Sequence, residues 1–267
     1  MDNQREIRKN FGKRASKYRK STTHGNQEDL LRMLKLLKPL PDTVALDVAT
    51  GGGHTAVALA KYVQKVIAID ITPEMLEEAA IHAAKNCVTN IEFQISDVHN
   101  LPFATGQFDL VTSRFAPHHF YDIKTALQEM CRVLKPGGLL YILDCSVYDG
   151  AETEREINRI EYLRDNSHIC SYSPRQWQEL LQKLPLKLLQ TSFIQTRYVL
   201  PDWFERMEVE QSTRQEVFKV LDSLSAEAKA LYPYDANYIT TYRFEFVAAC
   251  RFVKHVGHST VLKTPVE

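Results

Sequence analysis

Apolar positions along the chain follow two patterns, which alternate from about residue 44 onward. Short runs rich in Val, Ile and Leu are typical of buried strands, and apolar residues every three or four positions are typical of helices. Strands are predicted at 44–48, 66–69, 91–95, 108–112, 139–143, 186–193 and 238–252. Helices are predicted at 27–38, 55–61, 74–85, 123–134, 152–165, 175–184 and 201–232, the last with a break near 210–213.

Strands and helices that alternate in this way predict an α/β fold. The expected sheet is doubly wound and mostly parallel, with helices on both faces. Ligands of such sheets bind beyond the carboxyl ends of the strands. Four polar residues fall at those ends, namely Asp47, Asp70, Asp97 and Arg114. We therefore expect a ligand site where these residues converge.

The turn after the first strand is the strongest single signal. Gly51-Gly52-Gly53 lies between a strand and a helix, where missing Cβ atoms at Gly51 and Gly53 allow a ligand to approach the backbone. Asp70 follows nineteen positions after Gly51, where a carboxylate can accept hydrogen bonds from a ribose diol. The spacing Gly51-x-Gly53-x-x-Ala56 also fits a dinucleotide, so NAD(P) and S-adenosylmethionine both remain possible ligands at this point.

The first 20 residues are rich in basic side chains, with Phe11, Ala15 and Tyr18 at helical spacing on one face. A solvated helix, a nucleic-acid-binding arm and an organelle-targeting peptide would all have this pattern.

Composition narrows the class of protein. The 267 residues carry 33 basic and 33 acidic side chains, so no overall field attracts nucleic acid or a membrane surface. The five cysteines have no CxxC spacing, which favours reduced thiols over disulfides or a metal site. No apolar stretch approaches the roughly 20 residues that span a bilayer. We expect a soluble cytoplasmic protein, a monomer or homodimer, with no metal and no nucleic-acid partner.

Several motifs together resemble one family. They are LDVATGGGHTA at 46–56, LPF at 101–103, FDLVTSR at 108–114 with APHHF after it, and RVLKPGG at 132–138. In this combination the chain resembles class I S-adenosylmethionine-dependent methyltransferases, and among them the ubiquinone/menaquinone biosynthesis C-methyltransferase family (methyltransferase type 11), nearest to its uncharacterised bacterial members. The resemblance covers roughly residues 10 to 252, and dehydrogenases lack these later motifs. An NAD(P)-binding oxidoreductase is therefore the weaker alternative.

The resemblance implies a Rossmann-like sheet of seven strands, the last antiparallel, with helical lid insertions. It divides the chain into an N-terminal helical lid (1–26), an S-adenosylmethionine-binding core (27–147), the rest of the sheet with lid helices (148–252) and a loose tail (253–267). It favours a lid over a targeting peptide for the N-terminus, with a helix at 11–18 closing over the cofactor.

The resemblance also places cofactor contacts on this chain, moiety by moiety. The contacts are Asp47, Ala49, Gly51 and Gly53 for the methionine end, Asp70 for the ribose, Ile71, Met75, Asp97 and Val98 for the adenine, the Arg114 carbonyl for the ammonium, and Tyr18 from the lid. One departure is Ala49-Thr50, where many members have Gly-Cys, so the early turn differs in detail.

Methyl transfer to a phenol, an enol or an activated ring carbon also requires a base near neutral pKa. His118 and His119 directly follow the fourth strand and are the first candidates, with His168 next. The alternative for each of them is a packed or hydrogen-bonded loop residue.

The acceptor is defined mainly by exclusion. Arg114-Phe115-Ala116-Pro117 occupies the place of the (N/D)PPY motif of base-methylating enzymes, which argues against methylation of nucleic-acid bases. Aromatic lid candidates favour a small aromatic or apolar acceptor, methylated at carbon or oxygen, although all of them are equally compatible with core positions. These candidates are Phe115, Phe120, Tyr121, Tyr172, Trp203 and Phe204. The remaining alternative is an S-adenosylmethionine-binding protein that is not a methyltransferase, such as a regulatory module.

Overall fold

Seven strands form a single sheet in the computed structural model, which describes residues 2–21 and 23–251. The strands are β1 (Val44–Val48), β2 (Lys65–Asp70), β3 (Ile91–Ile95), β4 (Phe108–Arg114), β5 (Leu134–Ser146), β6 (Leu186–Val199) and β7 (Tyr238–Cys250). Their order in the sheet is β3-β2-β1-β4-β5-β7-β6. β7 runs antiparallel to both of its neighbours, and the pairs among β1 to β5 are parallel. The predicted seven-stranded sheet with an antiparallel last strand is confirmed.

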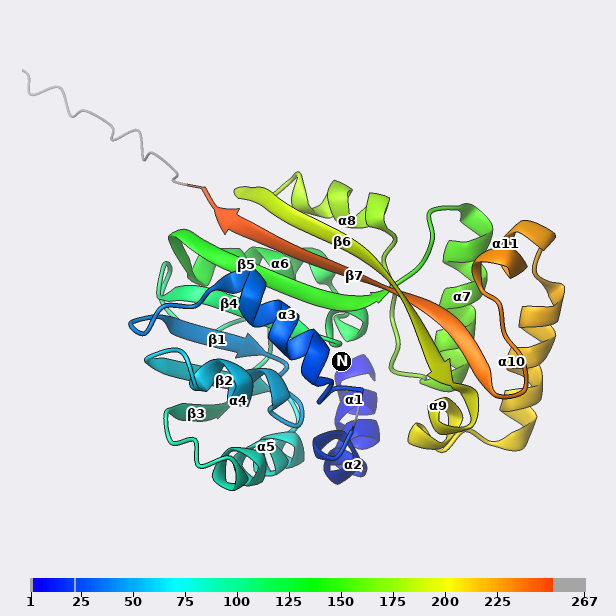
Figure 1. The fold of residues 1–267 in the computed structure, drawn as a ribbon, viewed down its shortest axis with the longest axis horizontal. Helices are drawn as coiled ribbons and strands as arrows, with labels where there is room; N and C mark the ends of the chain where they lie inside the picture. The colour runs from blue at the N-terminus through cyan, green and yellow to red at the C-terminus, as the bar shows by residue number, and fades with distance from the viewer. Residues whose placement is uncertain (1, 22, 252–267) are drawn as a thin grey trace, which may run out of the picture.

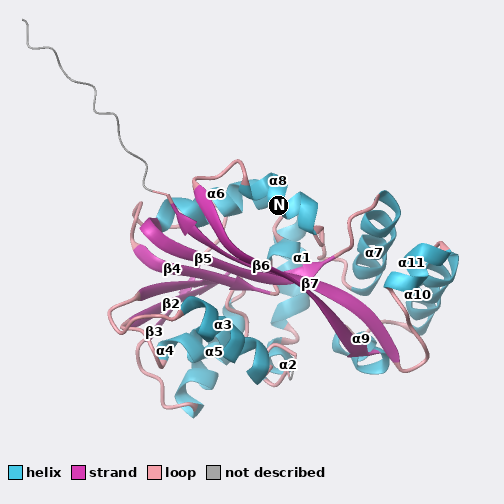
Figure 2. Ribbon diagram, turned by 45° about the horizontal axis from the view of Figure 1, so that its top comes forward, coloured by secondary structure: helices cyan, strands magenta, loops and turns pink. Residues whose placement is uncertain are grey.

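The alternation of side chains along β1 explains why the sheet is covered on both faces. Leu46 and Val48 are buried against α6 (Ile123–Val133) and α8 (Pro174–Leu181), whereas Ala45 is buried against α3 (Gln27–Leu37) and α4 (His54–Ala60). Figure 2 shows these two helical layers on opposite sides of the strands, with α5 (Pro73–Lys85) in the same layer as α3 and α4. The parallel order brings the carboxyl ends of β1, β2 and β4 to one edge of the sheet.

A second group of helices lies beyond one end of the long strands β6 and β7. It consists of α7 (Ala151–Arg164), α9 (Leu200–Arg206), α10 (Gln211–Ser223) and α11 (Ala226–Leu231). Trp203, Leu221 and Tyr232 form its buried core together with Tyr242 of β7. In Figure 1 this group lies on the right, and α1 (Asp2–Gly12) and α2 (Ala15–Arg19) lie between it and the layer of α3 to α5.

Several predicted boundaries were wrong. The helix predicted at 11–18 is two helices, because the backbone turns at residues 13 and 14. The helix predicted at 201–232 is α9, α10 and α11, with a second, unpredicted break at Leu224. The β6 strand runs to Val199 because β7 pairs with it along its whole length. The tail predicted at 253–267 lies outside the described residues.

The β5 strand begins at Leu134, inside the stretch predicted as a helix end and turn. Leu134 pairs with Phe108 and Leu139 pairs with Leu110, so extra residues bulge out between the two pairs. Gly137, at φ 83°, permits the bulge. Local propensity identified the turn residues correctly but missed the pairing that extends the strand across them.

Candidate active site

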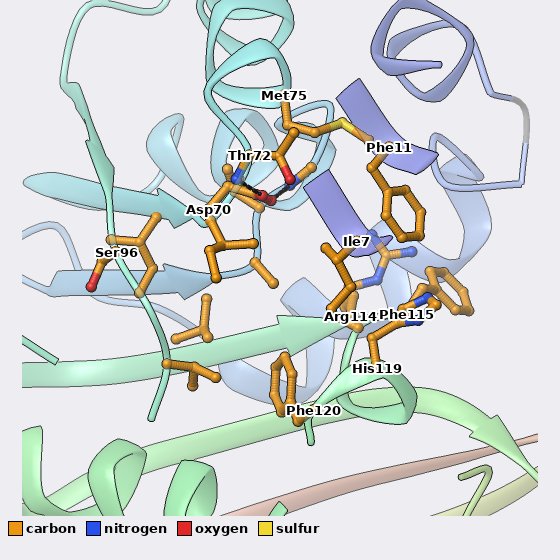
Figure 3. A pocket seen from close by; sticks show the side chains of 18 of the residues that line it. Ile7, Phe11, Asp70, Thr72, Met75, Ser96, Arg114, Phe115, His119 and Phe120 are labelled. Carbon is orange, nitrogen blue, oxygen red and sulfur yellow. Dashed lines mark hydrogen bonds between the residues drawn. The ribbon is translucent and has the colours of Figure 1, made fainter. Parts of the chain in front are cut away.

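A cavity of about 960 Å³, open solvent at its mouth included, lies at the carboxyl ends of β1, β2 and β4. We call it the first cavity. Figure 3 shows Ile7 and Phe11 of α1 reaching toward the strand ends that carry Asp70 and Arg114. Nine of the eleven residues expected to hold the cofactor line it, namely Tyr18, Ala49, Gly51, Asp70, Ile71, Met75, Asp97, Val98 and Arg114. The structure thus brings together residues from five separate segments.

The three glycines of the turn after β1 have different surroundings. Gly51, at φ 52°, has nothing within 4 Å of the position of an added Cβ, so it faces open space at the cavity. A Cβ on Gly52 would lie 2.8 Å from Cα of Arg19 in α2, and one on Gly53 would lie 2.9 Å from Cβ of Ala79 in α5. Gly53 therefore allows helix packing. Gly53 does not line the first cavity, so its expected contact with the ligand stays a prediction.

Asp70 holds the turn and still faces the cavity. One carboxylate oxygen accepts from the backbone N–H of Gly51 at 2.9 Å, and the other accepts from the N–H of Thr72 at 2.9 Å. Burial raises the pKa of Asp70, although these bonds oppose the shift. A carboxylate has about four lone-pair sites, so Asp70 keeps acceptor capacity for ribose hydroxyls.

Asp47 is 1% exposed and does not line the first cavity. Its oxygens accept from the hydroxyls of Thr50 at 2.6 Å and Thr112 at 2.7 Å. Burial raises its pKa to about 6 despite these bonds. Asp47 thus pairs with Thr112 of β4 and holds the turn through Thr50, and its expected contact with the methionine end stays a prediction.

Near Asp97, some polar groups on the cavity wall already have hydrogen-bond partners and others do not. Asp97 accepts from Nε2 of Gln4 at 2.5 Å and from the backbone N–H of His99 at 3.0 Å. Two buried hydroxyls that also line the cavity, Thr72 Oγ1 and Ser96 Oγ, have no hydrogen-bond partner among the described residues. Unpaired buried polar atoms on a cavity wall are suited to a polar ligand.

The first two helices form the outer wall. Besides Gln4, Arg8 donates to the carbonyl of Ile71 at 3.2 Å, and Arg19 forms an ion pair with Glu78. On the other side Arg14 and Lys17 form ion pairs with Glu208, at 3.1 and 2.6 Å. The N-terminal segment therefore joins the sheet layer to the second helical group across the cavity mouth.

A second cavity shares part of its wall with the first. Phe11, Tyr18, His24, Phe115 and His119 line both. Phe115 holds a left-handed backbone conformation, φ 53°, directly after β4, which is a strained position for an aromatic residue.

The rest of the second cavity is more polar than the sequence suggested. Its wall includes Glu161, Arg164 and Asp165 of α7, Trp203 and Arg206 of α9, and Tyr198 of β6. Of the aromatic lid candidates, Phe115 lines both cavities, Phe120 and Tyr121 line the first, and Trp203 lines the second. Tyr172 and Phe204 line neither and belong to the hydrophobic cores.

His118 is buried on the wall of the second cavity and is held by Asp144. Its Nδ1 lies 2.6 Å from one Asp144 oxygen, and its backbone N–H donates to the other at 2.7 Å. Burial lowers the pKa of His118, but the Asp144 carboxylate outweighs burial and raises it above the ordinary value. We did not predict a role for Asp144, although it follows the strand predicted at 139–143 just as other acids follow other strands.

His119 and His168 differ from His118. His119 lines both cavities, and Nδ1 lies 3.1 Å from the carbonyl of Ser167. Burial, together with His118, lowers its pKa to about 3, so the ring stays neutral. His168 is buried, lines neither cavity and has Nε2 2.8 Å from Oδ1 of Asn158. Because the polypeptide encloses its ring, His168 is less suited than His118 to take a proton from an acceptor, and its role as a base stays a prediction.

Comparison with known proteins agrees with this geometry. Residues 40–214 match a family model described as a methyltransferase domain. The chain is 32% identical over 221 residues to the uncharacterized methyltransferase YcgJ of Bacillus subtilis, which covers 82% of this chain and 87% of that protein. It is 35% identical over 120 residues to the demethylmenaquinone methyltransferase of Porphyromonas gingivalis, 43% of this chain and 49% of that one. A methyltransferase crystal structure from Bacillus halodurans superposes with a TM-score of 0.81 at 28% identity, covering 84% of this chain and all of that one.

Proposed function

The chain belongs to the methyltransferase-domain family and is an S-adenosylmethionine-dependent methyltransferase, and from this premise we propose that it methylates a small aromatic acceptor at carbon or oxygen. The observation that carries the proposal is the common wall of the two cavities, where Phe11, Phe115 and His119 face both. A donor in the first cavity and an acceptor in the second would meet at this wall.

The residues of the first cavity suit the cofactor. Asp70 retains acceptor capacity, Gly51 faces open space, and the unpaired hydroxyls of Thr72 and Ser96 await polar partners. We assign the ribose to Asp70 and the adenine to the region of Ile71, Met75, Asp97 and Val98. Bound S-adenosylmethionine supplies an activated methyl group on a sulfonium. Because Gln4 occupies one Asp97 oxygen, we expect it to move when adenine binds there.

The protein's contribution is positioning, dehydration and proton removal. Alignment of the acceptor can supply roughly 7–11 kcal/mol of the barrier. The aromatic side chains around the common wall would stack an aromatic ring and keep water away. His118 is the base we assign, because Asp144 holds Nδ1 and leaves Nε2 to take the proton that the acceptor loses. His119, with a pKa of about 3, is the weaker base.

The function is tested with labelled S-adenosylmethionine and a panel of phenols, quinols and their saturated analogues. We expect transfer to aromatic members only. His118→Ala should lower turnover by about 10²–10⁴-fold, whereas cofactor affinity should stay nearly unchanged. His119→Ala is the matched neighbour and should have the smaller effect. Transfer to saturated analogues at equal rates would contradict the aromatic acceptor, and an unaffected His118 variant would contradict the base.

The cofactor assignment is tested separately by calorimetry with S-adenosylhomocysteine and NAD. We expect binding of the first and none of the second. Asp70→Ala should weaken S-adenosylhomocysteine binding by about 1.5–3 kcal/mol, the range for hydrogen bonds to a charged group. Asp122→Ala, an acid at a helix start outside both cavities, serves as the control. Equal affinities in all three proteins would place the ribose elsewhere.

A further inference from the structure

Three arginines from distant parts of the chain converge where the two cavities meet. Arg114 of β4 and Arg243 of β7 lie over the ring of Phe115, with their guanidinium carbons 5.2 and 4.8 Å from its centre. Arg243 and Arg206 of α9 lie over the ring of Tyr198, at 5.6 and 5.7 Å. We call Arg114, Arg206 and Arg243 the arginine cluster.

The cluster has too few negative partners for its charge. Arg243 donates to Asp29 at 2.7 Å and to the Tyr198 hydroxyl at 2.9 Å, and Asp29 is shared with Arg32. Among the residues that the structure describes, no carboxylate lies within 4 Å of Arg114 or Arg206. Asp29 is thus the one carboxylate within 4 Å of these three guanidinium groups in the described part of the chain, although Asp29 and Asp47 also act on Arg114 from farther away.

Arg114 shows the deficit most clearly. It is 7% exposed, and its one hydrogen bond within the described chain is from Nη1 to the hydroxyl of Thr55 at 3.2 Å. Its Nε and Nη2 are buried and have no partner. A buried guanidinium without a partner is costly, so an anion that pairs with it gains much of that cost back. By contrast, Arg164, which lines the second cavity, has a carboxylate partner, because it donates to Glu161 at 2.8 Å.

Two members of the cluster line the cavities, Arg114 the first and Arg206 the second, whereas Arg243 lines neither. His24 lines both cavities, and burial followed by the nearby positive charges of Arg206, Arg114 and Arg243 lowers its pKa well below the usual value. An anion at this junction is therefore accessible from either side.

We propose that the arginine cluster is a carboxylate-binding site at the junction of the two cavities. The inference rests on the proposed function for the identity of the two cavities. A guanidinium presents paired N–H donors in a plane that matches a carboxylate. Two carboxylates can reach the site, that of the cofactor's methionine end through Arg114, and one on the acceptor through Arg206. The second source would make the acceptor an aromatic acid.

The first arm of the test compares two nucleosides by calorimetry. S-adenosylhomocysteine carries the amino-acid carboxylate, and 5′-methylthioadenosine lacks it. If Arg114 holds that carboxylate, Arg114→Met should bind S-adenosylhomocysteine roughly 10- to 100-fold more weakly and leave methylthioadenosine binding unchanged. Unchanged methylthioadenosine binding also proves that the variant folds. The affinity of Arg114→Lys for S-adenosylhomocysteine should fall between those of the wild type and Arg114→Met. Arg214→Met is the control, because Arg214 packs on Phe204 outside both cavities.

The second arm compares benzoate with benzamide by ligand-observed NMR, with and without S-adenosylhomocysteine. If Arg206 holds an acceptor carboxylate, the wild type should prefer benzoate and Arg206→Met should lose that preference. A carboxylate preference lost in either arm supports the cluster and identifies the source. No dependence on Arg114 or Arg206 in either arm would overturn it. If the wild type binds neither nucleoside, the proposed function fails instead, and the benzoate arm alone decides the cluster.

Discussion

At the scale of single residues, burial and one specific partner decide which histidine can act. His118 and His119 are neighbours in sequence and both are buried or nearly so, yet their pKa values move in opposite directions. The difference is the Asp144 carboxylate, which contacts His118 at two atoms, whereas Asp165 lies 4.0 Å from His119. A carboxylate that holds Nδ1 fixes the ring and leaves Nε2 as the proton acceptor.

Asp144→Asn tests this balance without a substrate. With the carboxylate charge removed, burial becomes the dominant effect, so the pKa of His118 should fall from above 6.5 to below it. A base acts in its neutral form, so the acidic limb of the activity profile should move to lower pH. An NMR titration of the His118 ring measures the pKa directly, with Asp122→Asn, an acid outside both cavities, as the control. If the pKa of His118 is the same in both variants, Asp144 does not control it.

At the scale of elements, α1 and α2 form a cover held mainly by polar contacts. Phe11 and Ala15 form a small apolar cluster with Met75 of α5, whereas bonds to Asp97, Glu78 and Glu208 hold the rim. Lys17 and Glu208 are about half exposed, and such ion pairs contribute little each, so the side of the cover that meets the second helical group can open at low cost. The segment that was expected to be a lid has the contacts that a lid needs, and whether it moves remains a prediction.

Gly52→Ala should loosen the cover specifically. The new Cβ would lie 2.8 Å from the Arg19 backbone, so α2 must shift away from the glycine turn. We expect faster tryptic cleavage at Lys13 to Lys20 and weaker protection by S-adenosylhomocysteine. Gly12→Ala lies in α1 itself but meets only the flexible end of Glu74, at 3.2 Å, and should cleave like the wild type. Equal cleavage rates in all three proteins would show that α2 does not pack on this turn in solution.

At the scale of the whole molecule, buried neutral histidines set the acid stability. Burial lowers the pKa of four of them, to about 4 for His54 and about 3 for His119, with His24 and His168 also well below 6.5. In the unfolded chain these rings bind protons below about pH 6.5, whereas the folded protein does not. Stability should therefore fall as pH drops below 6.5.

Two groups oppose this trend and one does not enter it. Asp47 and Asp70 have raised pKa values, so the folded state takes up their protons first and gains stability as pH falls. His118, with a raised pKa, contributes stability that is fully present below 6.5 and is lost only above it. Four histidines against two acids leave a net loss. Urea unfolding from pH 7 to 5 should show it, and His54→Gln should reduce the slope. Stability independent of pH in this window would contradict the buried neutral rings.

No described helix is long and apolar enough to cross a membrane. The second helical group is joined to the sheet through β6 and β7, and α1 and α2 close the space between the two parts. The common wall of the cavities is thus built from the N-terminus, the end of β4 and the second half of the chain together.

The periodicity of apolar residues and the polar residues at strand ends predicted most of the fold and part of the first cavity. The seven strands, the parallel core, the glycine turn and the position of Asp70 could all be predicted, because alternation, glycine and chain punctuation act over a few residues. Boundaries failed where pairing between distant strands overrode local propensity, as at the start of β5 and the end of β6.

Side-chain direction and partnership were decided only by the tertiary structure. Asp47 and Asp70 end neighbouring strands alike, but Thr112 of β4 takes Asp47 away from the cavity while Asp70 stays on its wall. The His118–Asp144 pair and the arginine cluster join residues 26 to 129 positions apart. Nothing in a local pattern encodes such pairs, because charge, burial and hydrogen-bond satisfaction depend on which distant segments the sheet order brings into contact.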